Sequence, residues 1–168
     1  MKGRVLVACV GNIFLGDDGF GVEVARRLAG AELPDGVRVV DYGTGGMHLA
    51  YDLANGVGTA ILVDATPRGG TPGTVYVIEP ELPAKREPAT SDAPLAGGAL
   101  FDGHGMQPDV VLGVLDMLGA KTGRMLIVGC EPGSAEYGIG LSAPVAAAVD
   151  KAVSKVLELI GCDGGDGD

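Results

Sequence analysis

The sequence predicts a three-layer α/β/α sandwich over a mixed five-stranded sheet whose fourth strand is antiparallel. Short apolar runs alternate with helical patterns along most of the chain, which is typical of α/β domains. The runs are rich in Val, Ile and Leu rather than alternating with polar residues, so the sheet should be covered on both faces. Only nine residues, 65–73, separate the third run from the fourth. A parallel crossover needs about a dozen or more, so the fourth strand should run against the others.

Five apolar runs have the length and composition of strands. The first begins almost at the amino terminus, and each of the others is bounded by glycine, proline or polar residues that favour turns. We expect strands at Arg4–Val10, Val37–Tyr42, Thr59–Asp64, Thr74–Glu79 and Met125–Cys130.

Four segments between and after these runs have helical periodicity. The last shows it most clearly, because its valines recur on one side of a helix. Pro108 and Pro144 stand where a first helical turn should begin, a position that tolerates a missing N–H. We expect helices at Phe20–Ala29, Met47–Ala54, Pro108–Leu118 and Pro144–Ile160.

Composition narrows the class of protein. A chain of 168 residues is most simply one domain, which we place at residues 1–160 and follow with a disordered acidic tail at 161–168. The net charge of −10, without a basic cluster, excludes nucleic acid as an expected partner. No apolar run is long enough to span a membrane. Three cysteines and no secretory signal segment lead us to expect a cytoplasmic protein.

A glycine-rich loop at residues 11–21 follows the first strand directly and leads into a helix. It has the glycine content of a phosphate loop, but Asp17 and Asp18 occupy its centre. Their charge would repel a nucleotide phosphate, whereas a metal ion or a hydrolytic reaction could use it. One of the two should be a helix N-cap, and we assign Asp17 to a cap or supporting role.

Three polar residues should meet at the carboxyl edge of the sheet, where ligands of open α/β sheets gather. Asp18 lies after the first strand, Asp64 ends the third, and His104 precedes the third helix. Two carboxylates and an imidazole suit a divalent cation such as nickel or zinc. Taken singly, Asp64 could also be a turn residue and His104 could hydrogen-bond a loop carbonyl.

Five motifs, most of them rich in glycine, occur along the chain in an order and spacing that fit one domain over residues 4–160. They are residues 11–21, DYGTGG at 41–46, VDA at 63–65, DGHGM at 102–106, and GCEP at 129–132 with GLS at 140–142. Together they resemble the NiFe hydrogenase maturation endopeptidases. The fold of that family, an α/β/α sandwich over a mixed five-stranded sheet, agrees with the pattern above.

The resemblance implies a peptidase that removes the C-terminal extension of a NiFe hydrogenase large-subunit precursor after nickel insertion. It further implies that the nickel carried by the precursor is sensed through residues corresponding to Asp18, Asp64 and His104. We therefore expect no tightly bound cofactor of the chain's own, and a monomer. Many family members have Glu where this chain has Asp18; the shorter side chain keeps the charge but moves it by about one methylene.

The sequence leaves the mechanism open. No serine or cysteine stands in a nucleophile elbow, so covalent catalysis is disfavoured. Asp18 and Asp64 are the catalytic candidates, either as a general base on water in an aspartic-type reaction or assisting hydrolysis promoted by the nickel. Two alternatives are a stand-alone metal-dependent amidohydrolase or peptidase, and a non-catalytic nickel-sensing chaperone.

Two further expectations concern variants. Asp17→Asn should be milder than Asp18→Asn, because Asn caps a helix about as well as Asp. The long proline-rich segment Pro80–Gly103 should govern which precursor is recognised, because loops of this length usually carry function.

Overall fold

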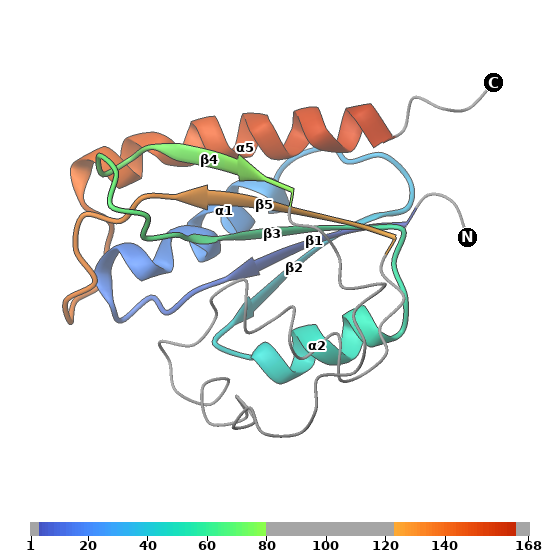
Figure 1. The fold of residues 1–168 in the computed structure, drawn as a ribbon, viewed down its shortest axis with the longest axis horizontal. Helices are drawn as coiled ribbons and strands as arrows, with labels where there is room; N and C mark the ends of the chain where they lie inside the picture. Colours follow the sequence, from blue (N-terminus) through green and yellow to red (C-terminus); the bar gives the residue numbers. More distant parts are fainter. Residues whose placement is uncertain (1–3, 80–122, 164–168) are drawn as a thin grey trace.

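A five-stranded mixed sheet with helices on both faces forms the molecule (Figure 1). The computed structural model describes residues 4–79 and 123–163. The sheet has the order β2-β1-β3-β5-β4, in which only β4 is antiparallel to its neighbour. The elements are β1 (Val5–Val10), the 3-10 turn η1 (Gly16–Gly19), α1 (Phe20–Ala29), β2 (Val37–Gly43), α2 (Gly46–Ala54), β3 (Thr59–Ala65), β4 (Val75–Ile78), β5 (Arg124–Cys130) and α5 (Ala143–Asp163).

This architecture confirms the predicted fold class. All five strands lie where they were expected, and α1 has the predicted bounds. The antiparallel β4, inferred from a short connection, pairs with β5 so that Val75 lies opposite Cys130. The predicted helix Pro108–Leu118, the segment Pro80–Gly103 and His104 lie outside the described residues.

Two apolar clusters fill the spaces above and below the sheet. In β1, Val5, Val7 and Cys9 face one cluster and Leu6, Ala8 and Val10 face the other, because successive side chains of a strand point to opposite faces. The first cluster is closed by α1 and α5, and the second by α2. Both faces of the central strands are therefore buried under apolar side chains, as their unbroken apolar sequence predicted.

The last helix is longer than expected. α5 continues to Asp163, three residues beyond the predicted end at Ile160. The residues of this helix that belong to the apolar core extend to Ile160, so the hydrophobic periodicity of the sequence predicted a helix end at that residue. Within the described residues, no helix is both long and apolar enough to cross a membrane.

Gly21, in the first turn of α1, lets this helix approach the ends of two strands. A Cβ at Gly21 would overlap the carbonyl oxygen of Val10 and lie 2.6 Å from that of Val63. The absence of a side chain thus allows α1 to begin directly over the carboxyl ends of β1 and β3. This contact fixes where the loop before the helix, with its two aspartates, can lie.

Gly21→Ala should therefore destabilise the fold although alanine favours helices. The gain in helix propensity is about 1 kcal/mol, whereas overlap with fixed backbone carbonyls should cost more, for a net loss of about 2 kcal/mol. Gly30→Ala is the matched control, because a Cβ there would meet only the Arg27 carbonyl at 3.9 Å. Urea unfolding of both variants measures the difference; equal stabilities would contradict this account of the contact.

Candidate active site

Asp18 lies in η1, directly after β1, at the edge of the sheet where the parallel strands end. Its side chain is half-buried, and its Oδ2 accepts a hydrogen bond from the Asn12 N–H at 3.0 Å. The carboxylate is thus held across its own loop. The loop after β1 supplies the first predicted acid at the predicted edge.

Asp64 is the penultimate residue of β3, between β1 and β5 in the middle of the sheet. Its Oδ1 accepts a hydrogen bond from the Ala65 N–H at 2.8 Å. Burial raises the pKa of this carboxyl well above its usual value, and the negative charge of Asp18 raises it further. The hydrogen bond from Ala65 acts in the opposite direction but does not compensate.

The structure therefore brings Asp18 and Asp64 close enough to repel each other at the carboxyl edge. His104, the third predicted ligand, lies outside the described residues. Within residues 4–79 and 123–163, no group of three side chains that could hold a metal ion is found. Two carboxylates in a partly desolvated position form an anionic site that favours either a proton or a cation.

Asp17 has a different role from its neighbour. It is fully buried, and its carboxylate accepts hydrogen bonds from the N–H groups of Gly133 (2.7 Å), Ser134 (2.8 Å) and Ser142 (2.6 Å) and from the Ser142 hydroxyl (2.8 Å). Burial alone would raise its pKa, but the hydrogen bonds from Ser142, Ser134 and Gly133 outweigh burial and lower it. Asp17 thus ties the loop after β1 to the loop after β5.

The expectation that one of the two aspartates caps a helix is wrong. Neither η1 nor α1 has a side-chain cap hydrogen bond, and Gly19 occupies the N-cap position of α1. The N–H groups that Asp17 accepts from belong to residues more than 100 positions away. Asp17 therefore accepts its hydrogen bonds from a distant loop rather than from the first turn of the neighbouring helix.

Glu131 is a buried acid of the GCEP motif, and the sequence predicted no role for it. It accepts hydrogen bonds from the N–H groups of Arg68 (2.8 Å) and Gly69 (3.1 Å) and from the Tyr76 hydroxyl (2.9 Å). Burial opposes its charge, but these donors lower its pKa overall. An acid directly after an apolar strand was the available signal. Glu131 fixes the connection that follows Asp64.

Cys9 and Cys130 have a structural role. They are fully buried inside apolar strands, and neither forms a disulfide. Desolvation, with the charge of Asp41, raises the pKa of Cys9 to about 12, and desolvation, with the charge of Asp17, raises that of Cys130 to about 11. Neither thiol is available as a thiolate near neutral pH.

Asp17→Asn should lower the free energy of unfolding by roughly 3 kcal/mol. The NH2 group of the asparagine would face groups that are themselves hydrogen-bond donors, and the negative charge that strengthens each hydrogen bond would be lost. This reverses the mild effect expected from helix capping. Asp35→Asn, at an exposed position before β2, should change stability by less than about 0.5 kcal/mol. Denaturant unfolding tests both variants. Near wild-type stability of Asp17→Asn would show that Asp17 does not hold the two loops together.

Asp64→Asn should have the opposite effect and raise the melting temperature at neutral pH. A carboxyl whose pKa is raised by folding destabilises the fold as pH rises from about 4, its unfolded value, through its folded pKa. Below pH 4 the acid is protonated in both states and this cost is absent. The stability gain of the variant should accordingly be smallest in acid and grow toward neutral pH. Thermal melts at several pH values measure it; a constant difference would contradict the raised pKa.

The chain is also similar to proteins whose family is known. A family model described as hydrogenase maturation protease matches residues 22–159. The hydrogenase expression/formation protein HupD of Rhodobacter capsulatus is 32% identical over 157 residues, covering 92% of this chain and 70% of that protein. The hydrogenase 2 maturation protease of Escherichia coli is 32% identical over 155 residues, covering 92% of this chain and 88% of that protein.

Solved structures show the same similarity in three dimensions. The hydrogenase maturating endopeptidase HybD from E. coli superposes with a TM-score of 0.75 at 33% identity, over 96% of this chain and 94% of that one. A hydrogenase 2 maturation peptidase from a Thaumarchaeota archaeon gives a TM-score of 0.70 at 34% identity, over 94% and 98% of the two chains. The chain belongs to the hydrogenase maturation protease family and is a hydrolase of peptide bonds.

Proposed function

We propose that this protein removes the C-terminal extension of a NiFe hydrogenase large-subunit precursor after nickel has been inserted. In this proposal the nickel belongs to the substrate, and Asp18, Asp64 and His104 read its presence. The reaction is expected in the cytoplasm. Membership of the maturation protease family supports the substrate class, and the paired aspartates support the metal-reading step.

The pair of acids is the observation that carries the proposal. Asp18 raises the pKa of Asp64 because both negative charges share a partly buried position at the carboxyl edge. A divalent cation placed between two carboxylates removes this repulsion and allows both to ionise. The site should thus favour a precursor that carries nickel over one that does not.

The two acids suit different tasks in hydrolysis. Burial, the larger cause of the raised pKa of Asp64, persists when nickel removes the repulsion from Asp18. A carboxylate with a raised pKa is the better proton acceptor near neutral pH, so we assign Asp64, beside the nickel, as the general base that takes a proton from the attacking water. Asp18, held by the Asn12 N–H, is assigned as the nickel ligand together with His104. Nickel held beside the scissile bond would polarise its carbonyl oxygen.

Two features of the described residues support water rather than a side chain as the nucleophile. The thiols of Cys9 and Cys130 are buried and have raised pKa values. The Ser142 hydroxyl donates its hydrogen bond to the buried Asp17, without a histidine to remove its proton within the described residues. Neither Ser142 nor these two thiols has the activation that covalent catalysis requires.

The decisive experiment is to incubate the purified protein with precursor that contains nickel and, in parallel, with nickel-free precursor. Mass spectrometry should show loss of a C-terminal peptide from the nickel-loaded precursor only. Unchanged mass together with a stable complex would instead identify a nickel-sensing chaperone. Cleavage of both precursors alike would overturn the metal-reading role.

Metal analysis separates the proposal from a stand-alone metal-dependent peptidase. If nickel arrives with the substrate, the purified protein should lose metal during dialysis against buffer. A protein that retains one equivalent of nickel or zinc, and cleaves small amides without precursor, would favour the stand-alone enzyme.

Asp18→Asn, Asp64→Asn and His104→Ala should each slow processing of the nickel-loaded precursor by about a hundredfold or more, because each removes a metal-binding or proton-accepting group. Asp64→Asn is expected to stabilise the protein, so a loss of its activity would not come from unfolding. Asp35→Asn, an exposed acid before β2, is the matched control and should process at the wild-type rate. Wild-type rates in the three site variants would refute the assignment.

A further inference from the structure

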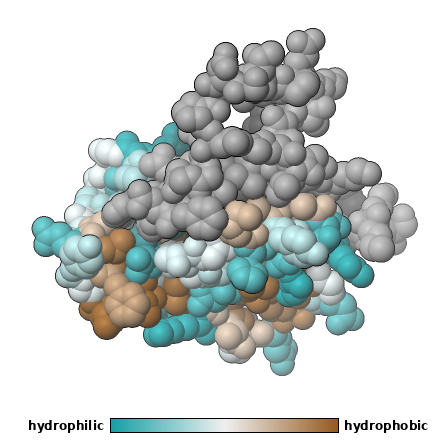
Figure 2. Space-filling view, turned by 90° about the horizontal axis from the view of Figure 1, so that it is seen from below, coloured by the Kyte–Doolittle hydropathy of each residue, from teal (hydrophilic) through white to brown (hydrophobic). Residues whose placement is uncertain are grey.

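Three large apolar side chains are exposed on two loops at the carboxyl edge of the sheet. Phe14 is 59% exposed, Tyr137 93% and Ile139 80%. Phe14 lies in the loop after β1, and Tyr137 and Ile139 lie in the loop after β5. Figure 2 shows strongly apolar atoms gathered at the left end of the molecule, the end toward which the parallel strands point in Figure 1. We call Phe14, Tyr137 and Ile139 the apolar rim.

The backbone directs the three side chains outward together. Leu15 and Gly138 form a parallel bridge between the two loops, which places Phe14 next to Tyr137. Side chains in such an arrangement alternate between two faces. Leu15 is buried, whereas Phe14, Tyr137 and Ile139, the neighbours of the bridged residues, are exposed.

The rim is held in place before any partner arrives. The Gly16 N–H donates to the Gly138 carbonyl at 2.9 Å, and the Gly138 N–H donates to the Phe14 carbonyl at 2.9 Å. The hydrogen bonds of Asp17 to Gly133, Ser134 and Ser142 fasten the same loops at their bases. A preformed surface loses little conformational entropy on binding.

A groove continues from the rim toward the helices. It has a volume of about 240 Å³ and is lined by Ile13, Gly19, Ile139, Leu141 and Val149 with charged residues of α1. These charges pair within the chain, Arg26 with Glu23 at 3.0 Å and Arg27 with Asp150. The groove can therefore accept an uncharged side chain without leaving a charge unpaired.

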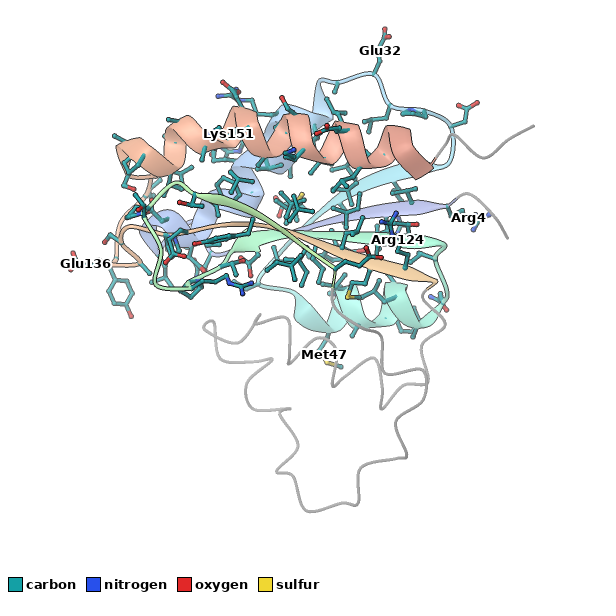
Figure 3. The ribbon with its side chains drawn as sticks, turned by 45° about the horizontal axis from the view of Figure 1, so that its top comes forward. Arg4, Glu32, Met47, Arg124, Glu136 and Lys151 are labelled. Carbon is teal, nitrogen blue, oxygen red and sulfur yellow. The ribbon has the colours of Figure 1, made fainter. Side chains whose placement is uncertain are left out.

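The rim is continuous with the candidate active site. Phe14 and Asp18 belong to one short loop, and Gly19, which lines the groove, follows Asp18 directly. Figure 3 places Glu136, the neighbour of Tyr137, at the same end of the molecule. Any protein whose peptide bond reaches Asp18 and Asp64 must approach over this end.

We propose that the apolar rim and its groove are the docking surface for the folded body of the precursor. The inference rests on the proposed function for the identity of that partner. The surface of the precursor that meets the rim should be apolar and should lie beside the segment to be cut, because the rim offers aromatic and aliphatic side chains. It should also be uncharged, because the charges that line the groove are already paired within the chain. Aromatic residues of this kind supply much of the binding energy in protein interfaces.

The test measures binding and cleavage separately in a Tyr137→Ser/Ile139→Ser double variant and in Phe14→Ser. Immobilised nickel-loaded precursor should bind each variant about tenfold or more weakly than it binds the wild type. The cleavage rate at saturating precursor should stay within about twofold of wild type, because the acids are untouched. Melting temperatures should be unchanged, since the replaced side chains are exposed.

Tyr51→Ser is the matched control, because Tyr51 is 70% exposed but lies on α2, on the other side of the sheet. It should bind and cleave like the wild type. Wild-type affinity in both rim variants would overturn the proposal, as would a wild-type dimer that the rim substitutions convert to monomer. If the wild type binds precursor through the rim but cuts nothing, docking stands and the proposed hydrolysis fails.

Discussion

The carboxylate of Asp17 is the constraint on which the functional end of this molecule depends. It is buried and accepts four hydrogen bonds from the loop after β5 while its own backbone belongs to the loop after β1. A buried charge is tolerated only when its hydrogen-bonding capacity is satisfied. Because three of these four partners are backbone N–H groups, the carboxylate fixes the path of both loops. The position of Asp18, and the bridge between Leu15 and Gly138, follow from that path.

Two adjacent residues of the same type therefore have opposite energetic roles. The environment of Asp17 favours its charge, whereas Asp18 and Asp64 oppose each other across a partly buried space. The first arrangement stabilises the fold, and the second costs stability that only a proton or a cation can recover. Such opposition is common where a site is built for function rather than for folding. In the proposed reaction, the precursor's nickel relieves the repulsion.

The same end of the sheet combines the acids with the apolar rim. Gly21 lets α1 begin at the ends of β1 and β3, Glu131 fixes the connection that follows β3, and Asp17 ties the remaining loops together. Asp64 near the end of β3, and the loops that carry Asp18 and the rim, are thus anchored to a sheet that is covered by apolar residues on both faces. A peptidase that acts on one folded partner needs this combination more than it needs a deep pocket for many side chains.

The sequence alone determined the order of elements, the bounds of α1 and the antiparallel direction of β4, because apolar periodicity and connection length are local properties. It also placed Asp18 and Asp64 at one edge, since parallel strands end on the same side of a sheet. The sequence indicated a helix-capping role for Asp17, because local statistics favour an aspartate there. The groups that donate to Asp17 instead lie more than 100 residues away. The sequence predicted no role for Glu131 and did not anticipate the apolar rim. Which of two adjacent aspartates is satisfied and which is left to repel another acid depends on where a distant loop folds back, and only the tertiary structure decides that.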